Sequence, residues 1–165
     1  MKTTTYTLEL LTPCFCAGAD QSKAEIRAPA IRGQLRWWFR ALGGSPADER
    51  EIFGGVAGTA SASSLSIRVL SIEPKIWSPP SFTPNDPESY VWYFASVSGT
   101  TVKGAKGPRW TTTAAHGAGS KFQIQLIQRR PISSAKQAQL DLAISCFLQL
   151  GAIGLRATRG LGAFH

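Results

Sequence analysis

The chain has 165 residues, of which 43% are hydrophobic and 17% charged, a composition typical of a single globular domain and not of a disordered segment. Its 18 Lys and Arg against 10 Asp and Glu give a net charge of +8, which favours a polyanionic partner, either nucleic acid or an acidic membrane surface. No apolar run reaches the roughly 18 residues of a membrane span, the N-terminus is a poor signal peptide, and three cysteines without such a signal suggest reduced thiols in the cytosol.

The first predicted element is a strand over residues 6–10, where apolar and polar side chains alternate. A helix is expected next, over about 33–42, because Pro29 disfavours helical backbone before about residue 30. The pair Gly43-Gly44 ends this helix. Its core-facing stripe, at helical spacing, consists of Leu35, Trp38, Phe39 and Leu42.

Three more strands and a second helix are predicted along the rest of the chain. The strands cover residues 65–69, 90–95 and 122–126, the second of them short and aromatic. The second helix begins at Ser134, which forms a capping box with Gln137, and ends at Gly151.

Two loop insertions, 78–87 and 99–120, interrupt this order, and the second is long enough to be functional. The succession of elements predicts an α+β fold of the ferredoxin-like (RRM-like) βαββαβ type over residues 1–165. Its last strand is expected to be short or missing, because only five residues follow Gly160.

The first predicted helix carries Arg32, Arg36 and Arg40 at successive i+4 positions. These cations either form a solvated face paired with acids such as those at 48, 49 and 51, or bind phosphates. Trp37 points away from the core stripe, so it is expected to be exposed, where it suits base stacking or a protein contact.

A glycine-rich stretch, 151–162, follows the second helix and contains Arg156 and Arg159. Dinucleotide-binding and Walker motifs follow a strand and open a helix, so both interpretations fail on context. A flexible loop whose backbone approaches an anion is expected instead, the alternative being a plain helix cap with a tail. Residues 103–110, which interleave cations with glycine and Trp110, form either an arm along nucleic acid or a solubilising loop.

Candidates for catalysis are few. His116 is a possible general base for attack by a ribose 2′-hydroxyl, although a histidine in an Ala/Gly-rich loop is more often merely exposed. Cys14 and Cys16 lack the spacing of a zinc site relative to the histidines. No catalytic residue, metal or cofactor is therefore expected.

The sequence resembles the repeat-associated mysterious protein (RAMP) superfamily of CRISPR systems. Three segments carry the likeness: Leu11-Thr12-Pro13, the run 24–42 with its Arg-Gly-Gln-Leu-Arg-Trp-Trp-Phe-Arg block, and Glu51-Ile52-Phe53-Gly54. Within the superfamily, it is most similar to the N-terminal half of the first-named subunit family of type III-B (Cmr) effector complexes. The glycine-rich stretch matches the superfamily's glycine-rich loop, and residues 55–133 align only by strand order.

The resemblance implies a cytoplasmic, non-catalytic subunit that holds crRNA or target RNA in antiviral defence, with other RAMP subunits as partners and no membrane. An open sheet edge suggests that a second chain, a split half or a second copy, completes the sheet, which light scattering would detect. Trp37 and Trp110 are expected to contact a partner or stack on bases. The expected RNA-binding residues are Arg27, Arg32, Arg36, Arg40, Lys103, Lys106, Arg109, Gly154, Arg156, Arg159, Gly160 and Gly162.

Two alternatives stay open. One is a stand-alone RAMP endoribonuclease that processes CRISPR RNA without a metal and uses His116 as its base. The other is a small RNA-binding protein of RRM type unrelated to CRISPR, faintly suggested by the sequence 159–164 but lacking the stacking aromatics of that motif.

Overall fold

A computed structural model describes residues 1–20, 22–56, 60–78, 87, 89–92, 96–97, 109–110 and 114–165. Among these residues, no helix is long and apolar enough to cross a membrane. The elements in chain order are β1 (Lys2–Glu9), β2 (Cys14–Phe15), α1 (Ala28–Ala41), α2 (Pro46–Phe53), β3 (Leu65–Glu73), α3 (Ser89–Trp92), β4 (Ser96–Val97), β5 (Arg109–Trp110), β6 (Ala115–His116), β7 (Lys121–Gln128), α4 (Ser134–Leu150) and the 3₁₀ turn η1 (Ala157–Arg159).

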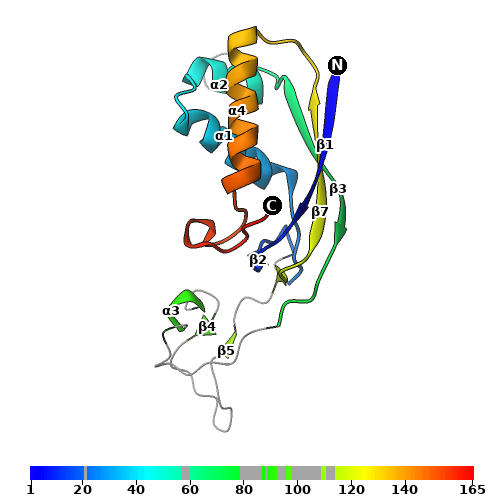
Figure 1. Ribbon diagram of the computed structural model, residues 1–165, viewed down its shortest axis with the longest axis vertical. Coiled ribbons are helices and arrows are strands. Elements are labelled where there is room, and N and C mark those ends of the chain that lie inside the picture. Colours follow the sequence, from blue (N-terminus) through cyan, green and yellow to red (C-terminus); the bar gives the residue numbers. More distant parts are fainter. Residues whose placement is uncertain are drawn as a thin grey trace.

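The central sheet has the strand order β1-β7-β3 and is antiparallel throughout. Leu8 lies opposite Phe122, and Ile67 lies opposite Leu126. The chain passes from β1 to β3 by way of α1 and leaves β7 for α4, and both helices cover one face of the sheet (Figure 1). This arrangement is that of a ferredoxin-like fold with a reduced closing strand, so the predicted α+β class is confirmed.

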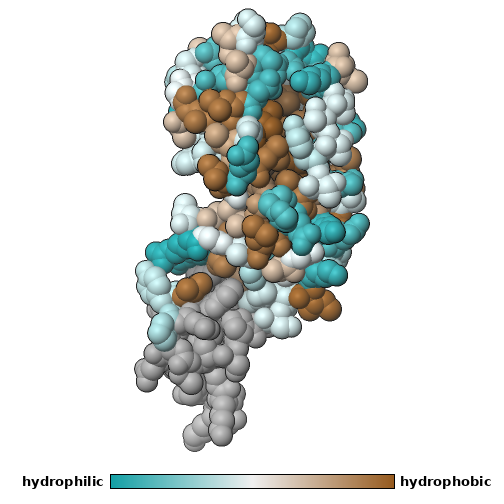
Figure 2. Space-filling view, in the orientation of Figure 1, coloured by the Kyte–Doolittle hydropathy of each residue, from teal (hydrophilic) through white to brown (hydrophobic). Residues whose placement is uncertain are grey.

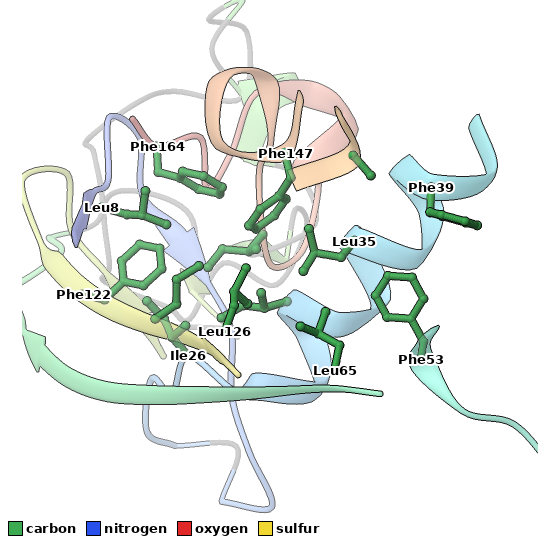
Figure 3. Packing of buried hydrophobic residues seen from close by; sticks show 14 of the residues in the cluster. Leu8, Ile26, Leu35, Phe39, Phe53, Leu65, Phe122, Leu126, Phe147 and Phe164 are labelled. Atoms are coloured by element: carbon green, nitrogen blue, oxygen red, sulfur yellow. The ribbon is translucent and has the colours of Figure 1, made fainter. Parts of the chain in front are cut away.

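The core lies between this face of the sheet and the two long helices. Figure 3 shows Leu8, Phe122 and Leu126 from the sheet pointing toward Leu35 of α1 and Phe147 of α4. The alternation of residues along the strands produces this layer, because side chains at every second position share a face. Helical spacing does the same on α1, whose buried residues are Ile31, Leu35 and Phe39.

The C-terminal residues take the place of the closing strand beside β1. Phe164 bridges Leu10, and Glu9 and His165 exchange two backbone hydrogen bonds of 3.0 Å. The Phe164 ring is 2% exposed, and its centroid lies 5.0 Å from that of Phe147. The end of the chain is therefore part of the core rather than a tail.

The helix boundaries differ from those expected. α1 begins at Ala28 and not near residue 33, because Pro29 occupies the first turn, where its missing N–H is no loss. The cap of α4 is Ser133 rather than Ser134, and its hydroxyl accepts the N–H of Lys136.

Two other local predictions were wrong. Residues 89–92 form a helical turn, α3, and not the start of an aromatic strand; residues 93–95 lie outside the described part. The 99–120 loop ends in packed structure, since β6 pairs with β2 and Ser120 is fully buried. β5, which falls in the same predicted loop, pairs with β4, which precedes the loop.

Candidate nucleic-acid interface

The two N-terminal helices form a cleft whose walls carry arginines. Arg32, Arg36 and Arg40 follow one another at i+4 spacing, so they share one side of α1. α2 brings Arg50 to the same opening, and the Phe53 ring of this helix packs edge-on against Phe39 of α1 at 5.9 Å. The cleft has a volume of about 900 Å³ and is also lined by Glu49, Gly54, Gly55 and residues 60–63. We refer to it as the arginine cleft.

Glu49 is the acidic residue of the arginine cleft, and it is only 5% exposed. Its Oε1 accepts a hydrogen bond from Arg36 Nε at 2.5 Å, and its Oε2 lies 3.7 Å from Arg40 Nε. Asp48 and Glu51 pair instead with Lys136 of α4. The hypothesis that this acidic group neutralises the helix arginines is therefore correct for Glu49 and wrong for the other two.

The cluster around Lys136 ties α2 to α4. The Ser45 hydroxyl, followed by the Lys136 ammonium, lowers the pKa of the Asp48 carboxyl below its ordinary value. Hydrogen bonds to Glu51 and then Asp48 raise the pKa of Lys136. Both directions favour the charged forms that pair between α2 and α4.

Arg32 and Arg50 keep their charge unneutralised in the described part of the chain, where no carboxylate oxygen lies within 4.0 Å of either guanidinium. Four arginines against one glutamate leave the cleft lining with a net charge of +3. Arg50 is absent from the RNA-binding residues predicted above, because α2 is not among the predicted elements. A signal was present: Ser45 caps this helix, Pro46 begins it and Asp48 lies in its first turn.

Trp37 is 52% exposed, as its position on the helical wheel predicted. It lines a second cleft, of about 460 Å³, together with Trp38, Arg40 and Leu150. The other residues of this cleft come from α1 and from the glycine-rich stretch, at its start and in η1: Gly33, Gln34, Gly151, Ala152, Ala157 and Thr158. We call it the tryptophan cleft.

The glycine-rich stretch folds back on itself instead of forming an open loop. The N–H groups of Gly160 and Gly162 donate to Ala157 and Pro13, at 3.2 and 2.9 Å. A Cβ on Gly154 would lie 2.6 Å from the Phe15 carbonyl oxygen. These glycines therefore close a packed turn. The N–H groups of Gly160 and Gly162 already donate to backbone carbonyls, so they are not available to bind an anion as expected.

The remaining predicted contacts are dispersed. Arg27 occupies the N-cap position of α1 without a side-chain capping bond, and its Nε lies 3.7 Å from Glu25 Oε1. Arg159 lies over the Tyr90 ring, 5.1 Å from its centroid, and Arg156 has a left-handed backbone at the start of η1. Lys103 and Lys106 lie outside the described residues, and of Arg109 and Trp110 only the backbone, in β5, is described.

Cys14 of β2 and His116 of β6 lie opposite each other in paired strands, and both are buried. Cys16, which follows β2, is half-buried, and its sulfur lies 3.4 Å from that of Cys14. Within the described residues, no group of three or more His, Cys, Asp or Glu side chains could hold a metal. His116 is 7% exposed, its Nε2 has no hydrogen-bond partner among the described residues, and burial lowers its pKa.

Burial of His116 gives the folding stability a pH dependence. Because its folded pKa lies below the ordinary 6.5, the unfolded chain binds a proton that the folded chain does not. The free energy of unfolding therefore has its full value above about pH 6.5. It falls as the pH drops toward the folded pKa of His116, by up to about 1.4 kcal/mol per pH unit. We expect urea denaturation between pH 7.5 and 5 to show this loss, and His116→Leu to abolish it; an unchanged slope in the variant would contradict the assignment.

The fold and the site together define a class of protein, a two-layer ferredoxin-like domain. It has a basic cleft beside α1 and a glycine-rich turn after its second long helix, α4. A family model described as the RAMP superfamily matches residues 7–165. The chain therefore belongs to the RAMP superfamily.

Two proteins of Pyrococcus furiosus resemble the chain in sequence. The CRISPR system Cmr subunit Cmr1-1 is 30% identical over 173 aligned positions, which cover 98% of this chain and 44% of that protein. The Cmr subunit Cmr1-2 is 46% identical over 39 positions, 24% of this chain and 21% of that protein. The chain thus spans less than half the length of the relatives it matches.

A solved structure also shares the fold. A chain of a type IV-B CRISPR complex superposes with a TM-score of 0.63 at 17% identity, covering 99% of this chain and 88% of that one. At this identity the likeness concerns the fold alone.

Proposed function

We propose that this chain is an RNA-binding, non-catalytic subunit of a type III-B (Cmr) CRISPR effector complex, and that the arginine cleft holds the sugar-phosphate backbone of crRNA or target RNA. The observation that carries the proposal is the convergence of four guanidinium groups on one open cleft with a single carboxylate among them. The curated relatives, named as Cmr subunits, support the assignment to such a complex.

The cleft suits a phosphate chain better than a compact acidic ligand. Its arginines are spread along one side of α1 and the facing α2, so they offer several donors in succession. Each guanidinium presents a planar fork that matches phosphate oxygens. Contacts of this kind bind the backbone without reading bases, which agrees with a complex in which guide pairing supplies the sequence specificity.

Absence of catalysis by this chain is part of the proposal. The one internal histidine, His116, is buried in β6, which pairs with β2, and it is not among the residues that line the arginine cleft. A general base must come within hydrogen-bond reach of the substrate hydroxyl. Incubation of the chain with repeat RNA should leave the RNA intact, and cutting that disappears in His116→Ala would favour the endoribonuclease alternative.

The outer edge of β1 is the place for the proposed protein partner. The C-terminal residues pair with Glu9 to Leu11, and in the described part of the chain no strand lies beside the earlier residues of β1 on that side. An edge of this kind accepts a further strand. We propose that a second chain or another RAMP subunit pairs here in a cytoplasmic complex.

The RNA proposal predicts a specific loss of binding. Arg32→Ala and Arg50→Ala should each weaken binding of single-stranded RNA whatever its sequence, because each removes one phosphate contact. The slope of log affinity against log salt should flatten by about 0.7 per residue. Fluorescence anisotropy at several salt concentrations measures both quantities.

Arg68→Ala is the matched control, since it removes the same charge from an exposed position of β3 outside the cleft. It should leave the slope nearly unchanged. Equal losses in Arg32→Ala and Arg68→Ala would reduce the effect to net charge and contradict a backbone site in the cleft.

A further inference from the structure

Arg40 belongs to both clefts described above. Its side chain lines the arginine cleft beside Arg36 and also the tryptophan cleft beside Trp37. The two openings therefore adjoin at one guanidinium on α1. Figure 2 shows hydrophobic residues reaching the surface beside the helices and a notch between the helical part and the C-terminal turn.

We propose that the tryptophan cleft receives one unstacked nucleobase of the RNA strand whose phosphates lie in the arginine cleft. This inference rests on the RNA-binding function proposed above and adds to it a base contact on the same strand. The volume of about 460 Å³ lies in the range of small-ligand pockets, about 300–1,000 Å³.

The walls of the tryptophan cleft suit a flat heteroaromatic ring. The Trp37 ring is half exposed and is braced edge-on by the Trp38 ring, with 5.0 Å between centroids and 84° between planes. The indole is thus supported before any ligand binds. Base stacking on such a ring tolerates any sequence, because every base has a π-face.

The lining of the tryptophan cleft also includes small residues of α1 and the glycine-rich stretch, among them Gly33, Gly151 and Ala152. Gly151 is fixed as glycine, since a Cβ there would lie 2.2 Å from the Phe147 carbonyl oxygen. Gln34 and Thr158 add polar side chains that can donate to and accept from a base edge.

Charge decides between a nucleobase and an apolar side chain of a partner protein. A protein anchor needs only the apolar walls, whereas a nucleotide also needs a cation for its phosphate at the mouth of the pocket. Arg40 supplies that cation, and its ion pair with Glu49 is long, 3.7 Å, with the Arg40 side chain 55% exposed. The occupant that uses both clefts at once is a nucleotide.

The test compares two ligands of equal length and charge: an unstructured single-stranded RNA and the same ribose-phosphate chain without bases. We expect the wild-type chain to bind the base-bearing strand about tenfold more tightly, the order of magnitude of one base stacked on an aromatic ring. Trp37→Ala should bind both ligands equally, at the wild-type affinity for the abasic strand. Trp37→Phe should retain most of the preference, and Leu142→Ala, which truncates a half-exposed side chain outside the cleft, should retain all of it.

Each other outcome has a distinct meaning. Equal wild-type affinity for the two ligands, or an equal loss on both in Trp37→Ala, overturns the base contact while the RNA-binding function stands. If the wild-type chain binds neither ligand, the proposed function itself fails. If Trp37→Ala keeps the preference for bases but loses association with another RAMP subunit, the cleft is a protein contact and the inference is wrong.

Discussion

Gly162→Ala should lower the free energy of unfolding by about 3 kcal/mol or more. Gly162 has φ +67, and a Cβ on it would lie 1.8 Å from the carbonyl oxygen of Ile153. Ile153 in turn donates its N–H to the Gly162 carbonyl at 3.0 Å. An alanine therefore combines left-handed strain with a clash inside a hydrogen-bonded pair, and relief of the clash pulls Phe164 out of the core.

Thermal or urea denaturation measures this loss, which corresponds to roughly 6–12 °C in melting temperature for a chain of this size. Gly160→Ala is the control, because Gly160 has φ +83 but nothing within 4 Å of an added Cβ. It should cost only about 1 kcal/mol of backbone strain. Equal losses at the two positions would contradict the packing argument. A loss of RNA affinity without a loss of stability in Gly162→Ala would instead assign this glycine to the ligand.

The sequence predicts the two-layer core well because its signals are local and redundant. Alternation over β1, β3 and β7 and the helical stripe through Leu35 and Phe39 each determine which face is buried. Burial depends on these periods more than on exact boundaries. The predicted start of α1 is several residues too late because of Pro29, yet Leu35 and Phe39 are buried as predicted; only Ile31, in the missed first turn, is a core residue of α1 outside the predicted stripe.

The candidate site depends on contacts between segments that the sequence does not pair. The charge pattern identified Arg32, Arg36 and Arg40, but only the packing of α2 on α1 brings Arg50 to them. The exposure of Trp37 followed from helical geometry. Its neighbour Leu150, in contrast, comes from the end of α4, more than 100 residues later in the chain.

The glycine-rich stretch shows why composition alone was insufficient there. Its glycines and arginines indicated a flexible anion-binding loop, whereas the close approaches at Gly154 and Gly162 come from contacts with Phe15 and Ile153. A glycine needed for backbone freedom and one needed for space look identical in a sequence.

Glu49→Gln should move stability and RNA affinity in opposite directions. The carboxylate is nearly buried and holds Arg36 by a 2.5 Å hydrogen bond, so its neutralisation leaves neighbouring arginines to repel each other. We expect a loss of about 1–2 kcal/mol in the free energy of unfolding, kept moderate because the Arg36 and Arg40 side chains are 39% and 55% exposed.

The same substitution removes the only negative charge among the described residues that line the arginine cleft. A unit charge about 8 Å from a phosphate is worth roughly 1 kcal/mol at an intermediate dielectric constant, so the affinity for single-stranded RNA should rise about fivefold. Denaturation and anisotropy on the same preparation measure the two effects.

Glu51→Gln provides the comparison, since it neutralises a carboxylate of the same helix that pairs with Lys136 outside the cleft. Its effect on RNA affinity should be small, because an exposed charge beyond the cleft is screened by salt. An affinity gain in Glu49→Gln alone would mean that this buried carboxylate sets how much of the arginine charge the RNA encounters. Unchanged or weaker RNA binding in Glu49→Gln would mean instead that it mainly orients Arg36 toward the phosphate.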